Sequence, residues 1–371
     1  MKLAIIADDF TGANDVALQL SKYGIDIVSL LNLENIPEYF VYSTETRNVK
    51  EMDAQTKLME TFDKIRNIGA DKIYKKIDST LRGNVKIELE EFLKILEEKE
   101  KIAVILPFPE LNRVVKNGKL YINNTELIDT EYSKDVYWKL SSSNVLDYFG
   151  GELITLEEIR TKNLDRIIKE KINKVIVFEA ETEEDMKKIA KSLVETNYDK
   201  NILGSSGIME YLLEIWGYKK KEVLIISGSC NPINIKQTEI FIEKVNPTIY
   251  DYYVDEDKLE ITKGKNDYIL RTIRAGEKRS DKDLEDIKSK ISKISKTICE
   301  EKNINKVVLS GGDITIAFMN IFKLEGLKVI SEIETGVGYG EKNEWQIITK
   351  SGGYGSENIY VKAYEYIKNH N

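Results

Sequence analysis

Short apolar runs alternate with amphipathic stretches along most of the chain, and clusters of polar residues follow several of the apolar runs. The first apolar run, residues 2–7, predicts a buried strand, and residues 13–23 predict the helix that follows it. Regular alternation of strands and helices favours an α/β fold. Further strands are expected at residues 25–31, 39–42, 101–106 and 174–178, and further helices at residues 51–68 and 183–196.

The stretch from residue 73 to residue 96 carries the densest group of polar side chains. It opens as a short strand, breaks at Asp78, turns at Gly83 and continues as an amphipathic helix. Asn84 alone would suffice to cap that helix, so a site for an anionic, hydroxylated small molecule is the better explanation of the other polar groups. The alternative is a capped turn with solvated lysines. The polar side chains around the turn are Lys75, Lys76, Asp78, Ser79, Thr80, Arg82 and Asn84.

Polar residues also follow the first and third predicted strands, where ligands of open α/β sheets bind. The strand at residues 39–42 runs into STETR, which ends in Arg47. Two of the five prolines stiffen the loop PFPELNR at residues 107–113, and turn signals at residues 115–129 predict hairpins. The group after the first strand exceeds what helix capping requires; it consists of Asp8, Asp9, Thr11, Asn14 and Asp15.

The C-terminal half repeats one design three times: an apolar strand, then glycines, then polar residues. The repeats are VLIISGSCNP at residues 223–232, VVLSGGDITIAF at 307–318 and WQIITKSGGYGS at 345–356. Backbone amides at glycine loops and helix N-termini bind phosphate, so three such loops favour a polyphosphate ligand over plain turns. Neither GxxxxGK[ST] nor a GxGxxG after the first strand occurs, which excludes a P-loop and a standard dinucleotide-binding motif.

Composition narrows the class of protein. A chain of 371 residues favours two domains, and the charged run KKKE at residues 219–222 is the expected connector. The net charge of −8, without a basic stripe, argues against nucleic acid, and no apolar stretch predicts a membrane span. The chain begins with a predicted strand instead of a signal peptide, so a cytoplasmic location is expected.

The scarcity of histidine and cysteine excludes several kinds of catalytic site. Because His370 is the only histidine, a Ser-His-Asp triad, a Cys-His pair and a His zinc site are implausible. Cys230 and Cys299 have neither disulfide-framework nor metal-ligand spacing. Acid–base chemistry must therefore fall to Asp, Glu, Lys or Tyr.

These observations together predict two α/β halves with different ligands. The N-terminal half suits a polyol carboxylate, and the C-terminal half suits nucleotide phosphates. A cleft between such halves is what phosphoryl transfer needs, because catalysis there is mostly positioning and charge neutralisation. A kinase would also need a carboxylate base and a divalent cation.

Seven motifs, in order, resemble those of the four-carbon acid sugar kinase family: ADDFTGAND, STETR, KKIDSTLRGN, PFPELNR, GSCNP, SGGD and KSGGYGSE. The resemblance spans nearly the whole chain. It implies ATP-dependent phosphorylation of the terminal hydroxyl of a four-carbon sugar acid, such as threonate, erythronate or 3-oxo-tetronate. It also implies an acid-sugar-binding domain at residues 1–218, a nucleotide-binding domain at residues 219–371 and a cleft between them. ATP and Mg²⁺ are the expected cofactors, and a homodimer is a candidate assembly.

The resemblance also assigns roles to residues. Arg82 is the choice for the substrate carboxylate, because its fork can bind bidentately, and Asp8 or Asp78 is the candidate base. Asp313 is the candidate magnesium partner, and Lys350 would meet a phosphate or be solvated. The expected catalytic residues are Asp8, Lys76, Asp78 and Arg82; the substrate-binding residues are Asp9, Asn14, Asp15, Arg47, Ser79 and Asn84; and the nucleotide-binding residues are Ser229, Gly311, Gly312, Asp313, Gly352 and Gly353.

Some positions depart from the family's pattern and leave the sugar acid open. Ser43 stands where an aspartate is common, and Leu111 and Asn112 stand where a small residue and a glycine are common. A related hydroxy acid such as 4-hydroxythreonine is an alternative substrate. A phosphatase with an aspartyl nucleophile and a non-catalytic, nucleotide-responsive sugar-acid sensor are the alternative functions.

Overall fold

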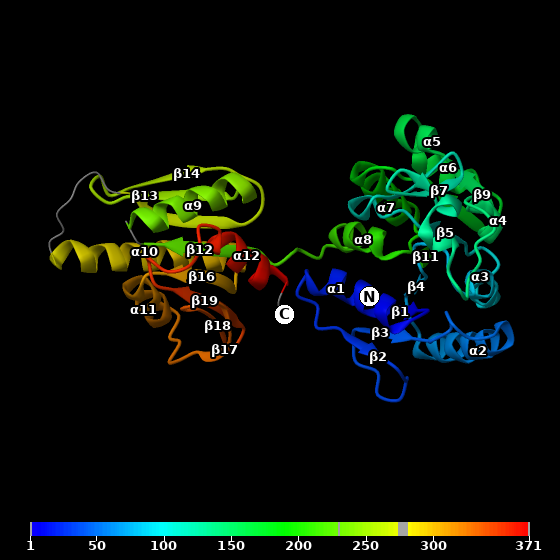
Figure 1. Cartoon of the computed structure of the whole chain (residues 1–371), viewed down its shortest axis with the longest axis horizontal. Helices are drawn as coiled ribbons and strands as arrows, with labels where there is room; N and C mark the ends of the chain where they lie inside the picture. The colour runs from blue at the N-terminus through cyan, green and yellow to red at the C-terminus, as the bar shows by residue number, and fades with distance from the viewer. Residues whose placement is uncertain (1, 229–230, 274–280, 370–371) are drawn as a thin grey trace. The chain divides into compact units, whose positions relative to one another are not determined.

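The computed structural model describes residues 2–228, 231–273 and 281–369. The chain divides into two compact units, Met1–Lys219 and Lys220–Asn371. Each unit is built on an eight-stranded sheet with helices on both faces (Figure 1). None of the helices in the described part of the chain combines the length and the apolar character that a membrane crossing requires.

The sheet of the first unit is parallel throughout, in the order β2-β3-β1-β4-β11-β5-β10-β9. All its strands therefore end at the same edge. Its strands are β1 (Leu3–Ala7), β2 (Val28–Leu30), β3 (Phe40–Ser43), β4 (Lys72–Lys76), β5 (Ile102–Ile105), β9 (Glu152–Ile154), β10 (Val175–Phe178) and β11 (Asn201–Gly204).

Side chains of each strand alternate between two apolar layers. Ile5 belongs to the core beneath α1, α5, α6, α7 and α8, whereas Ile6 belongs to the core beneath α2, α3 and α4. Because both faces are covered, β1, β5 and β10 are uninterrupted apolar runs. The helices are α1 (Phe10–Ser21), α2 (Glu51–Ile68), α3 (Val85–Lys94), α4 (Leu146–Phe149), α5 (Leu156–Thr161), α6 (Leu164–Glu170), α7 (Glu183–Thr196) and α8 (Met209–Ile215).

A three-stranded antiparallel sheet interrupts the alternation between β5 and β9. The NG turn at Asn117 and Gly118, both with positive φ, joins its first two strands, as the sequence predicts. Its strands are β6 (Arg113–Lys116), β7 (Lys119–Ile122) and β8 (Thr125–Glu126). Short 3₁₀ turns are η1 (Pro109–Leu111), η2 (Leu127–Asp129), η3 (Glu131–Ser133) and, after β11, η4 (Ser206–Ile208).

The second unit has a mixed sheet in the order β14-β13-β15-β12-β16-β19-β18-β17. Its centre is parallel, and β14, β18 and β17 run antiparallel to their neighbours. Helices α10 and α11 cover one face, and α9 and α12 cover the other. The elements are β12 (Val223–Ser227), α9 (Pro232–Val245), β13 (Thr248–Tyr253), β14 (Lys258–Thr262), β15 (Tyr268–Ile273), α10 (Asp281–Lys302), β16 (Lys306–Ser310), α11 (Gly312–Ile321), β17 (Lys328–Glu334), β18 (Val337–Lys342), β19 (Trp345–Lys350) and α12 (Ile359–Asn369).

Two local predictions near the N-terminal motifs are wrong. The first helix begins at Phe10 instead of residue 13, because the Asp9 side chain caps it by accepting a hydrogen bond from the Gly12 amide. Asn14 and Asp15 therefore lie beyond its first turn. Asn84 does precede α3, but its side chain makes no capping bond and instead donates to carbonyl groups of the loop after β3.

Candidate functional site

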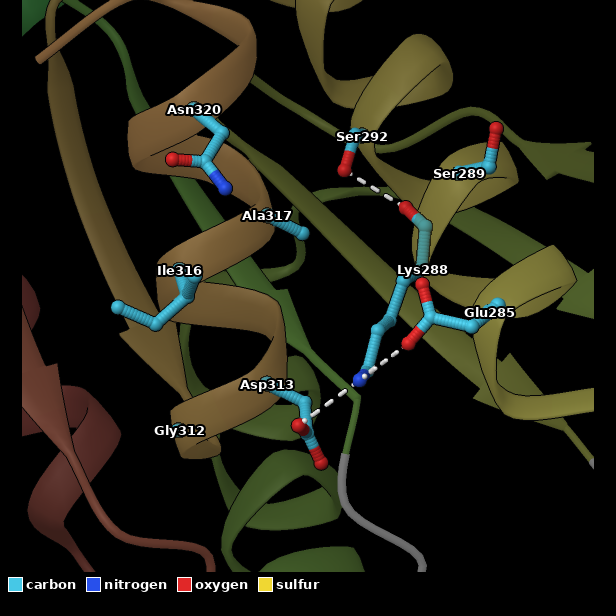
Figure 2. A pocket seen from close by; sticks show the side chains of 9 residues that line it. All are labelled: Glu285, Lys288, Ser289, Ser292, Gly312, Asp313, Ile316, Ala317 and Asn320. Carbon is cyan, nitrogen blue, oxygen red and sulfur yellow. Dashed lines mark hydrogen bonds and ion pairs between the residues drawn. The ribbon is translucent and has the colours of Figure 1, made fainter. Parts of the chain in front are cut away.

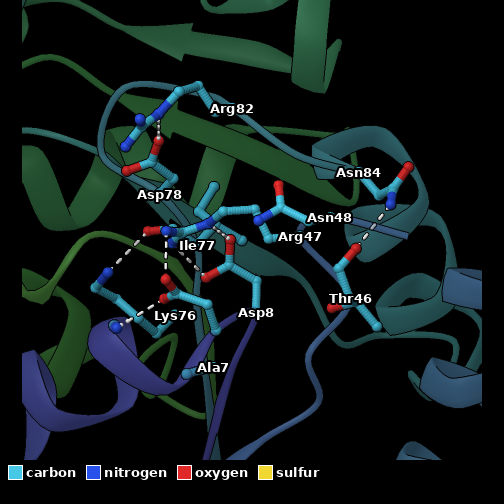
Figure 3. A network of polar contacts seen from close by, with 12 residues as sticks. Ala7, Asp8, Thr46, Arg47, Asn48, Lys76, Ile77, Asp78, Arg82 and Asn84 are labelled. Carbon is cyan, nitrogen blue, oxygen red and sulfur yellow. Dashed lines mark hydrogen bonds and ion pairs between the residues drawn. The ribbon is translucent and has the colours of Figure 1, made fainter. Parts of the chain in front are cut away.

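The N-terminal polar motifs meet at the carboxyl ends of three neighbouring strands. In the sheet register Ala7 of β1 pairs with Ser43 of β3 and with Lys76 of β4. The loop after β3 is tied to β1, because the amides of Thr46 and Arg47 both donate to the Asp8 carbonyl. Residues from three separate stretches of sequence thus form one polar network (Figure 3).

Arg47 is the centre of this network. Its Nε lies 2.8 Å from Asp8 Oδ2, its Nη2 lies 3.0 Å from Asp8 Oδ1, and its Nη1 lies 2.5 Å from Asp9 Oδ2. Burial acts to lower the pKa of Arg47, but the charges of Asp8, Asp78 and Asp9 outweigh it and raise this pKa. Burial also raises the pKa of Asp9, although Arg47 acts in the opposite direction.

Gly12 leaves the space that these charged groups occupy. A Cβ atom at this position would lie 2.6 Å from Asp9 Oδ1 and 3.2 Å from Lys76 Nζ. Gly83 has a φ of +100°, and a Cβ there would lie 3.0 Å from Arg47 Cγ. Both glycines of these two motifs are therefore required by close approach, and Gly83 also by its backbone conformation.

Asp78 lies in the loop after β4, and its contacts with the chain fall on one oxygen. Arg82 Nε lies 2.7 Å from Asp78 Oδ2, and Thr80 Oγ1 donates to the same oxygen. Burial raises the pKa of Asp78, but these hydrogen bonds and the charge of Arg47 outweigh it, so the pKa lies below its ordinary value. Among the described residues, Asp78 Oδ1 has no hydrogen-bond partner.

The Arg82 guanidinium group extends from Asp78 into a groove beside the small sheet. Its Nη1 lies 3.6 Å from Asp135 Oδ2, and its Cζ lies 5.6 Å from the centre of the Tyr132 ring. The groove encloses about 600 Å³. Its lining is mostly polar and comprises Arg82, Ile122, Asn123, Thr125, Asp129, Thr130, Glu131, Tyr132 and Asp135.

Lys76 and Asp15 form a second, looser pair at the same sheet edge. Lys76 Nζ donates to the Ile77 carbonyl at 3.1 Å and lies 3.8 Å from Asp15 Oδ2, which also accepts a hydrogen bond from Ser206. Lys76 is only 4 % exposed, yet one of its three N–H groups has a close acceptor among the described residues. This lysine can therefore bind an anion.

Three other predicted substrate-binding residues lie in different surroundings. Ser79 accepts a hydrogen bond from Arg113, the last residue of the proline loop. Asn84 is buried, and its Nδ2 donates to Thr46 O at 2.7 Å and Val49 O at 3.0 Å, so it joins two loops. Asn14 is exposed on α1, and its side chain makes no hydrogen bond within the part of the chain that the structure describes.

The two lysines at the end of β4 point to opposite faces of the sheet. Lys75 Nζ lies 2.6 Å from Glu88 Oε2 of α3, and both side chains are fully buried. Burial raises the pKa of Glu88, although Lys75 opposes this shift. Glu88 also accepts a hydrogen bond from Thr46, next to Arg47. The pair therefore supports the loop that carries Arg47.

The three predicted phosphate loops of the second unit follow neighbouring strands. β12, β16 and β19 are adjacent and parallel, so their loops lie at one sheet edge. Gly311, with a φ of +103°, precedes α11, and Gly312 begins that helix. Within the part of the chain that the structure describes, nothing outside α11 itself lies within 4 Å of a Cβ built at Gly312, so space remains at this end of the helix. The predicted Ser229 lies outside the described residues.

Asp313 opens a groove of about 630 Å³ between α10 and α11 (Figure 2). Its carboxylate is largely exposed and lies 3.0 Å from Lys288 Nζ, which also pairs with Glu285. The other lining residues are Ser289, Ser292, Gly312, Ile316, Ala317 and Asn320. Among the described residues no three His, Cys, Asp or Glu side chains gather where they could hold a metal ion.

The loop after β19 contains the predicted Gly352 and Gly353. The Gly352 carbonyl accepts a hydrogen bond from Lys350 Nζ at 3.2 Å. A Cβ at Gly353 would lie 3.4 Å from Asn231 Nδ2, which places this loop beside the N-terminus of α9. Gln237 of α9 donates to the carbonyls of Tyr354, Gly355 and Ser356. Lys350 itself is buried and not solvated.

Comparison with known proteins matches both units. A family model described as a sugar-binding N-terminal domain covers residues 3–212, and one described as a nucleotide-binding C-terminal domain covers residues 224–359. A D-threonate kinase from Salmonella typhimurium is 26% identical, over 99% of both chains. A D-erythronate kinase from Heliobacterium modesticaldum is 22% identical, over 98% of this chain and 97% of its own. The chain belongs to the four-carbon acid sugar kinase family.

Solved structures share the fold of this acid sugar kinase family member. A crystal structure from Bordetella bronchiseptica, described as a domain of unknown function with bound citrate and as a domain-swapped dimer, has a TM-score of 0.63 at 20% identity. It covers 100% of this chain and 99% of its own. A Haemophilus influenzae structure has a TM-score of 0.52 at 19% identity, over 98% of this chain and 100% of its own. The predicted family and the two-domain α/β fold are confirmed.

Several residues of the polar network and of the groove beside it were not predicted from the sequence. Arg113 and Ser206 reach the network from the segments after β5 and β11. Because both follow the ends of strands, they could have been predicted as candidate site residues. Tyr132 and Asp135 come from an irregular passage in which no pattern singles them out. The division between Lys76 and Lys75 follows from the two-residue period of a strand.

Proposed function

We propose that this protein is an ATP-dependent kinase that phosphorylates the terminal hydroxyl of a four-carbon sugar acid. The observation that carries the proposal is Asp78 Oδ1, a carboxylate oxygen that has no hydrogen-bond partner among the described residues. Its network also contains Arg47, Lys76 and Arg82. A base flanked by cations suits an anionic polyol. The names of the relatives, which include 3-oxo-tetronate kinase, support the same substrate class.

We assign the base to Asp78 in preference to Asp8. Arg47 occupies both oxygens of Asp8, whereas Asp78 is held through Oδ2 alone. The hydrogen bonds of Arg82 and Thr80 fix the orientation of the Asp78 carboxylate and keep it ionised at neutral pH. Asp78 Oδ1 can then accept the proton of a substrate hydroxyl.

The substrate carboxylate needs a cation with unused donors. Arg82 Nη2 has no partner among the described residues, and Lys76 has donors to spare. We propose that these two groups hold the acid end of the substrate, while Asp9, Asp15 and Ser79 accept hydrogen bonds from its hydroxyls. Asn84 would act through the loops that it joins.

The nucleotide phosphates fit the glycine loops of the second unit. The open N-terminus of α11, at Gly311 and Gly312, and the loop at Gly352 and Gly353 would present backbone amides to them. Mg²⁺ is held by one or two carboxylates plus substrate phosphates, so a single acid beside this loop fits it. Asp313 is that acid, and the ion would neutralise phosphate charge.

The proposed reaction balances without a further reactant. The substrate hydroxyl oxygen forms a bond to the γ-phosphorus of ATP, and the bond between that phosphorus and the bridging oxygen of ADP breaks. The hydroxyl proton moves to Asp78 Oδ1 and is later lost to solvent. The products are the sugar-acid phosphate and ADP.

We also propose a homodimer as the assembly in solution. The description of the Bordetella bronchiseptica structure as a domain-swapped dimer supports this proposal. Light scattering on the full chain tests it, and a monomer mass at assay concentration would contradict it.

Coupled ADP release tests the kinase function. Magnesium ATP would be offered with D- and L-threonate, D- and L-erythronate, 3-oxo-tetronates and 4-hydroxythreonine. Release of ADP that depends on one of these acids is the expected result and identifies the substrate. ATP binding without turnover across the panel would contradict the kinase and favour a nucleotide-responsive sensor.

A further inference from the structure

A buried polar row crosses the carboxyl ends of the three central strands of the second unit. Ser227 of β12 pairs in register with Ser310 of β16, and Ser310 pairs with Lys350 of β19. All three side chains are at most 3 % exposed. The row lies directly before the glycine loops proposed for the nucleotide phosphates.

Asn234 of α9 connects this row. Its Nδ2 donates to Ser227 Oγ at 2.7 Å. Its Oδ1 accepts from Ser310 Oγ at 3.0 Å, from Lys350 Nζ at 3.1 Å and from Tyr360 OH at 2.7 Å. The position of the Lys350 ammonium group is thus fixed from three secondary-structure elements, β16, α9 and α12.

The charge of Lys350 has no counterion in the described residues. Its ammonium group donates to three neutral oxygens: Asn234 Oδ1, Ser310 Oγ at 3.2 Å and the Gly352 carbonyl at 3.2 Å. The ring of Tyr360 lies 5.0 Å away. Burying an unpaired charge is costly. If the Lys350 side chain only filled space, an apolar side chain of similar size would make the protein more stable. We therefore infer that the Lys350 ammonium group binds an anion.

Acidic groups on the surrounding elements are directed to other partners. Asp313 of α11 pairs with Lys288, Glu357 beside α12 pairs with Lys236, and Glu334 of β17 pairs with Lys362. On α9, Glu239 and Glu243 make no ion pair with Lys350. Tyr360 faces Lys350 directly, and burial raises the pKa of its hydroxyl to about 12, so it stays neutral.

We propose that Lys350 is a positioning residue for the nucleotide phosphates. Lys350 ties the Gly352 loop to the strand ends, and it supplies a positive charge beside the bound phosphates. The inference rests on the proposed kinase function. Phosphate binding would then stabilise the protonated form of Lys350. Burial lowers the pKa of Lys350 to about 8 in the free protein, so nucleotide binding near this pH takes up a proton.

Calorimetry of ADP binding to the full chain measures this uptake. Titrations near pH 8 in two buffers with different ionisation enthalpies should give about half a proton taken up for each ADP bound. ADP itself contributes little, because its phosphates are already ionised at this pH. Adenosine, which lacks phosphates, should bind without proton uptake.

Two variants separate the charge of Lys350 from its packing. Lys350→Met should abolish proton uptake and weaken ADP binding about ten- to a hundredfold. Lys306→Met is the matched control: Lys306 is 3 % exposed, burial lowers its pKa to about 8, and it lies at the opposite end of β16. The control should leave proton uptake and ADP affinity unchanged.

The outcomes distinguish this inference from the proposed function. Failure of the wild-type protein to bind ADP would overturn the proposed function. ADP binding without proton uptake, or uptake that persists in Lys350→Met, would overturn the role of Lys350. If that variant fails to fold, the pH dependence of the wild-type affinity for ADP tests the role of Lys350. The affinity should fall by up to about tenfold per pH unit above pH 8. An affinity that does not change with pH would refute the proposal.

Discussion

The guanidinium group of Arg47 binds both carboxylate oxygens of Asp8, with Nε 2.8 Å from Oδ2 and Nη2 3.0 Å from Oδ1. A bidentate pair of this kind fixes the plane of the carboxylate and uses both of its oxygens. The contacts of Asp78 with Arg82 and Thr80 all end on Oδ2. Two acids that follow neighbouring strands are therefore suited to different tasks, Asp8 to holding Arg47 and Asp78 to accepting a proton.

Asp78→Asn should lower kcat by about 10²- to 10⁴-fold and leave ADP affinity unchanged, because the amide cannot accept the hydroxyl proton. Asp8→Asn is the comparison variant. It removes the main partner of the partly buried Arg47 and should lower the free energy of unfolding by about 2 to 4 kcal/mol. Steady-state kinetics and denaturant unfolding of both variants check this division. Retention of kcat within about threefold in Asp78→Asn would exclude Asp78 as the base.

Gly312→Asp should weaken ATP binding before it affects the sugar acid. Because a Cβ at Gly312 meets nothing within 4 Å, the substitution adds a charge without a clash. A carboxylate at the N-terminus of α11 would repel phosphates, and we expect an affinity loss of about tenfold or more. Gly312→Ala, with the same space and no charge, should bind ATP nearly as the wild type does. Equal losses in both variants, measured by calorimetry, would show a steric effect instead.

Gly12→Ala tests the close packing of the N-terminal network. The added Cβ would meet Asp9 Oδ1 at 2.6 Å and Lys76 Nζ at 3.2 Å, so the cap of α1 and the position of Lys76 must change. We expect a loss of about 1 to 3 kcal/mol in unfolding free energy and a higher KM for the sugar acid, with the KM for ATP unchanged. Gly326→Ala is the matched control, because Gly326, like Gly12, has no positive φ, and among the described residues nothing lies within 4 Å of its added Cβ. A wild-type KM in Gly12→Ala would refute the close packing.

The strand-to-helix units that carry the motifs could be predicted because their strands are apolar runs that end in polar clusters. The helices Glu51–Ile68 and Glu183–Thr196 have the predicted bounds, and Thr182 caps the second of them. Among the edge strands, β2 lies within the strand predicted at residues 25–31, but β14 could not be predicted. β14 is exposed along its whole length, and its charged side chains are typical of a loop.

The polar network could be predicted only as a list of residues and not as a set of pairs. Strand-end positions bring Asp8, Arg47 and Asp78 together, but which acid Arg47 binds depends on the path of the loop after β3. That loop is held by Asn84 and by the buried Lys75–Glu88 pair, which are contacts between segments distant in sequence. Neither spacing nor composition indicates them, so the candidate base could be reduced only to Asp8 or Asp78.

The lowered pKa of Lys306 leads us to expect an unusual dependence of stability on pH. Burial and the charge of Lys368 lower its pKa from 10.5 to about 8 in the folded protein, whereas the unfolded chain keeps the ordinary value. Between these pH values the unfolded state binds the extra proton, so the free energy of unfolding increases as pH rises, by about 1 kcal/mol per pH unit for each such lysine. Below pH 8 the full cost of burying the charge remains. Lys306→Met should therefore raise stability at neutral pH and reduce the slope of stability between pH 8 and pH 9, as urea unfolding can measure. An unchanged slope would mean that Lys306 titrates normally in the folded protein.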